Sequence, residues 1–237
     1  MLLFYIRHGD PIYNPDTLTP LGHRQAEAVG RRLAQFGLDE IYASSSNRAQ
    51  LTAKPACEMT HLEMRILDWT NENYAWEQLT MPYGDGLRWV FQHPDYRPIL
   101  ASAEVRALDR KWYEHPAFRN TKMQEGIERV QRETYAWLEG FGYHHDVEKN
   151  MYYSDGGNNK RIALFAHQGF STAFMSTVLD IPYPLYSIHF DIQHSGMTVI
   201  RFPEEEGWVI PKAMQVSNDA HIYRAGLPTL YNREVRL

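Results

Sequence analysis

Two histidines stand directly after short apolar runs that have the length and composition of β-strands. The first is His8 in the sequence IRHG, and the second is His167 in the sequence AHQG. In an open α/β sheet, ligands bind in the crevice beyond the carboxyl ends of the strands. Both imidazoles are therefore expected to project into one crevice if their strands are neighbours.

Two arginines accompany these histidines. Arg7 directly precedes His8, and Arg48 opens a helix that is expected after the second apolar run. A guanidinium group pairs bidentately with phosphate oxygens, which a lysine cannot do. Helix N-termini that follow strands add N–H donors for an anion. Together these groups predict a pocket for a tetrahedral dianion.

The chemistry that suits such a pocket is phosphoryl transfer. A neutral and oriented imidazole can attack phosphorus directly and form a covalent phosphohistidine. The arginines would neutralise the charge of the transferred group, so the chemistry requires no metal ion and no other cofactor.

The elements that must position these residues alternate between strand and helix. The run from Leu2 to Ile6 predicts the first strand. Thr19 and Pro20 predict the N-cap and first residue of a helix that ends at Gly37. Further strands are expected at residues 39–43, 161–166 and 197–202 and near 208–210, with helices at 48–60 and 124–139 and another that ends near 179. This alternation predicts an α/β fold, a three-layer α/β/α sandwich with a mostly parallel central sheet.

The chain of 237 residues is 43% hydrophobic and 22% charged, which suits one domain over residues 1–237. Residues 73–160 are less regular and are predicted to form an inserted, mainly helical cap region. Aromatic residues could line a substrate cleft there, although such residues more often belong to a core. The candidates are Trp69, Trp76, Tyr83, Trp89, Trp112 and Tyr113.

Composition excludes several other classes of protein. The net charge of −5 argues against a nucleic-acid-binding surface. No stretch approaches the roughly 20 apolar residues of a membrane span, and the N-terminal run is too short for a signal peptide. Cys57 is the single cysteine, which excludes an intramolecular disulfide and favours a cytoplasmic location.

More of the sequence resembles the histidine phosphatase superfamily, also called the phosphoglycerate mutase-like family. RHG is followed after four residues by Asn14, and LTPLGHRQA runs from Leu18 to Ala26. The segment SSSNRAQLTA from Ser44 to Ala53 resembles the family's SxxxRAxxTA, and the late HQG resembles its HxG. NDAH at residues 218–221 resembles a C-terminal segment often seen in members. The matches lie at both ends of the chain in the expected order.

The resemblance implies a phosphomonoester hydrolase, independent of metals and cofactors, in which His8 is the nucleophile. The residues that it assigns to the phosphoryl oxygens are Arg7, Asn14, Arg48, His167 and the backbone at Gln168. The substrate is expected to be a small phosphorylated molecule or a phosphoprotein, and the product inorganic phosphate. Gln168 departs from the usual HGG and adds a side chain at the pocket rim.

The family also needs a carboxylic acid to protonate the leaving oxygen and later to activate water. Members usually place a glutamate in an L-x-E setting after the second helix, and this chain has ILDWTNE at residues 66–72. Asp68 fits the pattern of an apolar residue, any residue and an acid, and it is slightly favoured. Glu72 has the longer side chain and lies one helical turn after Asp68. Glu104 or another carboxylate of the middle segment is the next candidate.

Two alternative functions remain at this stage. A phosphoglycerate mutase-type phosphotransferase must hold a second anionic group, and no extra arginine or lysine cluster stands near the motifs. A non-catalytic phospho-ligand-binding protein is favoured if both Asp68 and Glu72 point away from the pocket.

Other chemical motifs are weaker. His144, His145 and Glu148 could suggest metal ligands, but no further ligand cluster has suitable spacing, so a solvated loop is favoured. The spacing from Cys57 to Arg65 does not fit a cysteine phosphatase loop, and no GxxxxGK[ST] motif of a P-loop is present.

Overall fold

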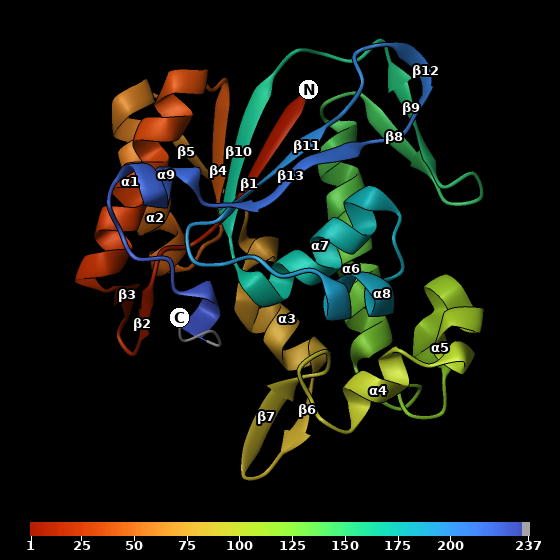
Figure 1. The fold of residues 1–237 in the computed structure, drawn as a ribbon. Coiled ribbons are helices and arrows are strands. Elements are labelled where there is room, and N and C mark those ends of the chain that lie inside the picture. Colours follow the sequence, from red (N-terminus) through yellow and green to blue (C-terminus); the bar gives the residue numbers. More distant parts are fainter. Residues whose placement is uncertain (234–237) are drawn as a thin grey trace.

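A six-stranded sheet runs through the middle of the computed structural model, which describes residues 1–233 (Figure 1). Its strand order is β13-β11-β1-β10-β4-β5. The neighbours from β1 to β5 are parallel, whereas β11 is antiparallel to both β1 and β13. The bounds are β1 (Leu2–Arg7), β4 (Glu40–Ala43), β5 (Met64–Ile66), β10 (Arg161–Ala166), β11 (Met197–Arg201) and β13 (Lys212–Asn218). The predicted α/β fold with a mostly parallel sheet is confirmed.

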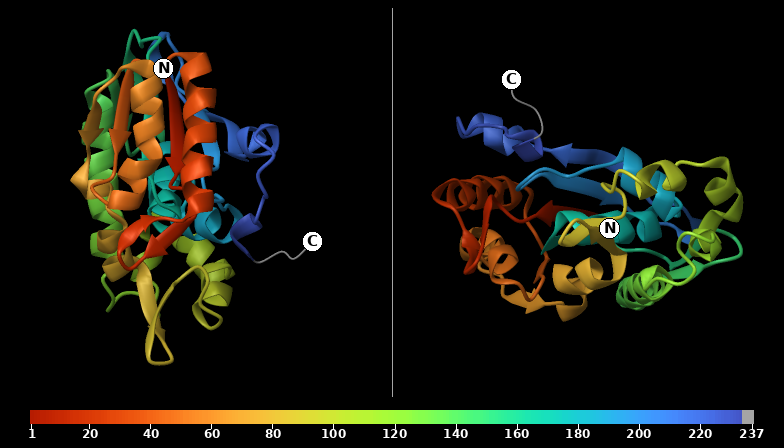
Figure 2. Two further views of the ribbon diagram at one scale, coloured as in Figure 1. Left: turned by 90° about the vertical axis from the view of Figure 1, so that its left-hand side faces the viewer. Right: turned by 90° about the horizontal axis from the view of Figure 1, so that it is seen from below.

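Helices cover both faces of this sheet, because successive residues of a strand point to opposite faces. Phe4 and Ile6 of β1 pack in a core with residues of α1 (Pro20–Phe36) and α2 (Asn47–Thr60). These two helices lie side by side (Figure 2). Leu3 and Tyr5 face the opposite core, which contains residues of α3 (Glu72–Leu79), α6 (Met123–Glu139) and α7 (Gln168–Leu179).

Local chemistry starts and ends the first helix as the sequence predicts. The Thr19 hydroxyl accepts a hydrogen bond from the Gly22 N–H at 3.0 Å, and Pro20 is the first helical residue. Gly37 ends the helix with a φ of 70°, which a glycine adopts at little cost. Residues 11–18, which follow the first strand, form a hairpin of β2 (Pro11–Tyr13) and β3 (Asp16–Leu18) rather than an irregular loop.

The segment that the sequence assigns to a cap is divided between two places. Helix α6 packs into the main core, together with a small sheet in which β9 pairs with β8 and β12. The β6–β7 hairpin and helices α4 and α5 instead lie beyond the carboxyl end of the sheet (Figure 1). The bounds are β6 (Thr80–Tyr83), β7 (Gly86–Trp89), α4 (Tyr96–Leu100), α5 (Ala103–Leu108), β8 (Tyr143–Asp146), β9 (Met151–Asp155) and β12 (Glu206–Val209).

The remaining elements are short. They are η1 (Asp68–Thr70), η2 (Asp109–Glu114), α8 (Tyr183–His189), α9 (Ala220–Arg224) and η3 (Tyr231–Arg233). Within residues 1–233, no helix combines the length and the apolar character that crossing a membrane requires.

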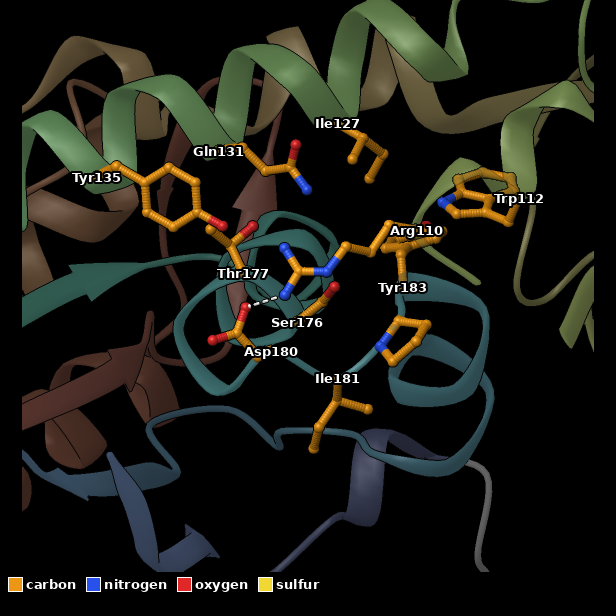
Figure 3. A pocket seen from close by; sticks show the side chains of 11 residues that line it. Arg110, Trp112, Ile127, Gln131, Tyr135, Ser176, Thr177, Asp180, Ile181 and Tyr183 are labelled. Carbon is orange, nitrogen blue, oxygen red and sulfur yellow. Dashed lines mark hydrogen bonds and ion pairs between the residues drawn. The ribbon is translucent and has the colours of Figure 1, made fainter. Parts of the chain in front are cut away.

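A largely buried ionic cluster ties the insertion to the C-terminal end of α7 (Figure 3). Asp180 follows α7 and accepts hydrogen bonds from Arg110 Nη2 at 2.6 Å and from His145 Nε2 at 2.9 Å. The His145 ring stacks on Tyr135 with 4.1 Å between ring centroids. Side chains of η2 and β8 therefore bind one carboxylate, and a side chain of α6 packs on them.

Replacement of Asp180 by asparagine should destabilise the fold. The amide keeps the side-chain shape and tolerates the left-handed backbone at this position, where φ is 53°. It removes the charge that Arg110 faces, so the free energy of unfolding should fall by about 1–3 kcal/mol in urea titrations. Asp146→Asn, at an ion pair with Lys149 on the surface, is the matched control and should unfold like the wild type. Equal stability of all three proteins would contradict the role given to Asp180.

Candidate active site

The carboxyl ends of β1 and β10 bring His8 and His167 together. The strands pair in parallel with Arg7 opposite Ala166, so both histidines leave the sheet at the same edge. Their ring centroids are 5.3 Å apart, and both residues are almost fully buried. The two imidazoles therefore meet at this edge of the sheet, as the sequence predicts.

The glycines of two motifs explain why the motifs occur together. A Cβ added to Gly9 would lie 2.6 Å from the Gly22 carbonyl oxygen, so any side chain there would push β1 away from α1. The Gly9 N–H donates to Thr52 Oγ1 at 3.0 Å, and this hydroxyl donates to the Arg48 carbonyl at 2.7 Å. The RHG, LTPLG and RAxxTA segments thus fix one another's positions.

One nitrogen of the His8 ring is fixed by its own backbone. His8 Nδ1 lies 2.8 Å from the Gly9 carbonyl oxygen, which can only accept, so Nδ1 carries the hydrogen. Burial, and after it the charge of Arg7, holds the pKa of His8 well below its usual range. The imidazole is therefore neutral near pH 7, and its lone pair is on Nε2.

His167 adopts the opposite tautomer. Arg48 Nη2 donates to His167 Nδ1 at 3.1 Å, so the hydrogen is on Nε2, which donates to Ser44 Oγ at 2.9 Å. The Tyr5 hydroxyl donates to the His167 carbonyl at 2.7 Å and holds the backbone of this residue. Burial, followed by the charge of Arg48, places the pKa of His167 well below its usual range as well.

Arg7 is buried and held by three acceptors. Its guanidinium group donates to the Ile192 carbonyl at 2.8 Å, to Asn232 Oδ1 at 2.5 Å and to His194 Nε2 at 2.8 Å. Burial lowers its pKa. Arg7 Nε is buried and has no hydrogen-bond partner among the residues that the structure describes, so a donor remains for an oxyanion.

Sequence reasoning missed two residues beside Arg7. His194 lies with its ring centroid 5.7 Å from that of His8 and its Nδ1 3.4 Å from Asp10 Oδ1. Asp10 directly follows the RHG motif, which was a signal that could have been used. His194 belongs to no recognisable motif, and only the fold brings it to the site.

Arg48 is held between two carboxylates. Its Nη1 lies 2.9 Å from Asp16 Oδ1 on the β2–β3 hairpin, and its Nη2 lies 3.1 Å from Glu72 Oε2. The other Glu72 oxygen accepts from the Gly169 N–H at 2.8 Å, in the first turn of α7. The Glu72 carboxylate therefore engages a guanidinium and a helix N-terminus, the kinds of donor that suit a phosphoryl group.

The two carboxylates proposed as the acid lie in different places. Asp68 is exposed and accepts from Ser45 Oγ at 2.5 Å and from the Tyr74 hydroxyl at 2.8 Å, hydrogen bonds that lower its pKa. Glu72 begins α3, and one of its oxygens lies within 4.8 Å of ring nitrogens of both His8 and His167. The structure thus brings Glu72, and not the slightly favoured Asp68, into the crevice.

Three other sequence candidates lie at the edge of the site or outside it. Asn14 is exposed in the turn between β2 and β3, and Glu104 is exposed in the first turn of α5. The Gln168 side chain donates to Asp191 Oδ1 at 3.0 Å. Of these three, only Gln168 stands in the first turn of α7, beside Gly169.

A cavity of about 820 Å³ opens beside Arg48 and Glu72. Trp76 and Trp89 form part of its wall and meet edge to face, with ring centroids 4.9 Å apart. A Cβ on Gly169 would lie 2.2 Å from the Trp89 ring, so only a glycine at this position allows Trp89 to pack here. Of the other aromatic candidates, Trp112 packs in the core, Trp69 and Tyr113 are partly buried against it, and Tyr83 is exposed.

His8, Glu72 and His167 could each offer one ligand atom to a metal ion, and they form the one such group within residues 1–233. Arg7 and Arg48 stand beside them, and a bound cation would be repelled by both guanidinium charges. The charge balance therefore suits an anion. His144 and His145 instead pair with Asp155 and Asp180.

Known proteins resemble this chain in sequence and in fold. The family model described as the histidine phosphatase superfamily (branch 1) matches residues 3–213. A Hydrogenobacter thermophilus protein named as a candidate phosphoserine phosphatase is 23% identical over 218 residues, which cover 88% of this chain and 93% of the relative.

Two solved structures share the fold. The phosphoserine phosphatase of Entamoeba histolytica, in complex with 3-phosphoglyceric acid, has a TM-score of 0.59 and 20% identity and covers 93% of this chain and 98% of its own. A mycobacterial glucosyl-3-phosphoglycerate phosphatase in complex with VO3 also has a TM-score of 0.59 and 20% identity, with coverages of 90% and 97%.

The histidine tautomers can be checked directly. At pH 6, where an exposed histidine is largely protonated, His8 and His167 should both remain neutral because burial disfavours their charged forms. Long-range ¹⁵N–¹H NMR spectra should show the hydrogen on Nδ1 of His8 and on Nε2 of His167. The variants His8→Gln and His167→Gln assign the signals. A doubly protonated ring at pH 6 would contradict the assignment for that residue.

Proposed function

The chain belongs to the histidine phosphatase superfamily, and we propose that it hydrolyses phosphate monoesters through a covalent phosphohistidine at His8. The observation that carries this proposal is the fixed tautomer of His8. The Gly9 carbonyl takes the hydrogen of Nδ1, which leaves the Nε2 lone pair available to a phosphorus atom. Two buried guanidinium groups stand beside the ring to receive the phosphoryl oxygens.

In the first step, His8 Nε2 attacks phosphorus in line with the ester oxygen. A P–N bond forms while the P–O ester bond breaks, and the electron pair stays on the leaving oxygen. Glu72 in its protonated form donates a proton to that oxygen, so an alcohol leaves. Arg7, Arg48 and the Gly169 N–H hold the three remaining oxygens and oppose their charge.

In the second step, the Glu72 carboxylate accepts a proton from water. The oxygen of this water attacks phosphorus, the P–N bond breaks, and its electron pair returns to His8 Nε2. Inorganic phosphate leaves and Glu72 is again protonated, so the cycle closes. We assign the acid and base role to Glu72 because its carboxylate lies within 4.8 Å of His8, whereas Asp68 is exposed and bound to Ser45 and Tyr74.

We propose a small phosphorylated molecule, rather than a phosphoprotein, as the substrate. The cavity of about 820 Å³ lies in the size range of small-molecule sites, and Trp76 and Trp89 wall it. The names of the relatives, which refer to phosphoserine and to glucosyl-3-phosphoglycerate, support the same class. The cytoplasmic location expected from the single cysteine stays a prediction.

Trapping the intermediate tests the nucleophile. After the protein is mixed with a ³²P-labelled aryl phosphate, the label should be found on His8 in the wild type. Treatment with acid should remove this label, because phosphohistidine is labile in acid. His8→Gln should lose turnover by about 10⁴-fold or more, as the loss of a catalytic nucleophile does elsewhere. His221→Gln changes a histidine other than His8 and His167, and it should be labelled like the wild type. A labelled His8→Gln protein, or phosphate transfer to an acceptor in place of phosphate release, would contradict the proposal.

Leaving-group dependence tests the acid. Glu72→Gln should slow formation of the phosphohistidine from an alkyl phosphate by about 100-fold or more, and its formation from p-nitrophenyl phosphate much less, because that leaving group needs no proton. Asp68→Asn is the matched control, since it removes the other candidate carboxylate, and should act close to the wild-type rate on both esters. If Asp68→Asn shows the selective loss and Glu72→Gln does not, the assignment is wrong.

A further inference from the structure

A second cavity of about 240 Å³ adjoins the one beside Arg48 and Glu72. The two cavities share Arg88 and Gln92 in their walls, so these residues stand at the junction. Arg88 belongs to β7, in the hairpin that lies beyond the carboxyl end of the sheet (Figure 1). A molecule bound with its phosphoryl group near Arg48 can therefore extend past Trp89 towards Arg88.

The lining of the second cavity has an excess of cationic donors. Arg88 and Arg97 both line it, and neither forms an ion pair with an acidic side chain within residues 1–233. Its one carboxylate, Asp191, already accepts from the Gln168 amide at 3.0 Å, the Ile192 N–H at 2.7 Å and the Asn232 amide at 2.7 Å. The lining therefore keeps a net positive charge, with two guanidinium groups against one carboxylate.

Arg88 is also held in place without being neutralised. Its guanidinium carbon lies 4.8 Å from the centroid of the Tyr83 ring, on the paired strand of the same hairpin. A cation–π contact orients the group and leaves its N–H donors available for an anion. The residue is half-buried, so an ion pair formed there would be less weakened by solvent than one on the surface.

We propose that Arg88 binds a carboxylate of the substrate, so that the preferred substrates are small phosphate monoesters that carry a carboxylate as well. This inference rests on the proposed phosphatase function for the position of the phosphoryl group. The planar guanidinium matches a carboxylate bidentately, and the Gln92 side chain at the same junction supplies a neutral donor. Sequence reasoning found no second cationic cluster because Arg88 lies far along the chain from the family motifs.

The test compares two esters that differ only in this group. 3-Phosphoglycerate has a carboxylate where glycerol 3-phosphate has a hydroxymethyl group. The wild type should favour 3-phosphoglycerate in kcat/KM, and Arg88→Gln should lower this preference by about tenfold or more, chiefly through KM, because a charge-assisted hydrogen bond is lost. Arg88→Lys should restore part of it. Arg119→Gln, an exposed arginine of the same insertion, should keep the wild-type ratio.

Two results would overturn the subsite: no wild-type preference between the esters, or a ratio that Arg88→Gln leaves unchanged although circular dichroism shows a folded protein. Failure of the proposed function looks different. If the wild type hydrolyses neither ester nor p-nitrophenyl phosphate, the phosphatase proposal fails. Calorimetric affinities of the two esters for the wild type and for Arg88→Gln then test the subsite. The ratio of the affinity for 3-phosphoglycerate to that for glycerol 3-phosphate should fall in Arg88→Gln.

Discussion

The burial of two guanidinium groups at one edge of the sheet is the constraint on which the site depends. Arg7 and Arg48 are both largely removed from water, and burial disfavours a charged group that lacks partners. The chain provides fixed acceptors for both groups. Ile192, His194 and Asn232 accept from Arg7, and Asp16 and Glu72 accept from Arg48. Burial, and after it the charges of these cations, lowers the pKa of His8 and keeps its ring neutral.

The position of Glu72 follows from this constraint. Arg48 and the Gly169 N–H require an anion, and the Glu72 carboxylate supplies one. A phosphoryl group that takes over these donors would leave Glu72 beside the ester oxygen, where an acid is needed. The residue that pairs with Arg48 and the proposed acid of the reaction can therefore both be Glu72.

Most of the framework was predictable, because its signals are local. The strand before His8, the Thr19 cap and the end of helix α1 at Gly37 each depend on neighbouring residues. The choice between Asp68 and Glu72, in contrast, depends on how the chain packs and not on neighbouring residues. Asp68 lies in a 3-10 turn bound to Ser45, and Asn71 caps a new helix that begins at Glu72. A spacing counted along the chain therefore points to the exposed residue of this turn and not to the residue that lies near His8. His194 and Arg88 reach the site only through long-range packing.

One contact connects the sheet edge to the insertion. Gly169 has no Cβ, so the Trp89 ring packs directly on the first turn of α7, whose N–H engages Glu72. Trp89 and Arg88 are adjacent in β7. Helix α7, whose first turn is proposed to bind the phosphoryl group, therefore also packs against the hairpin that carries Arg88. The chemistry proposed at His8 and the selection proposed at Arg88 therefore both depend on the position of α7.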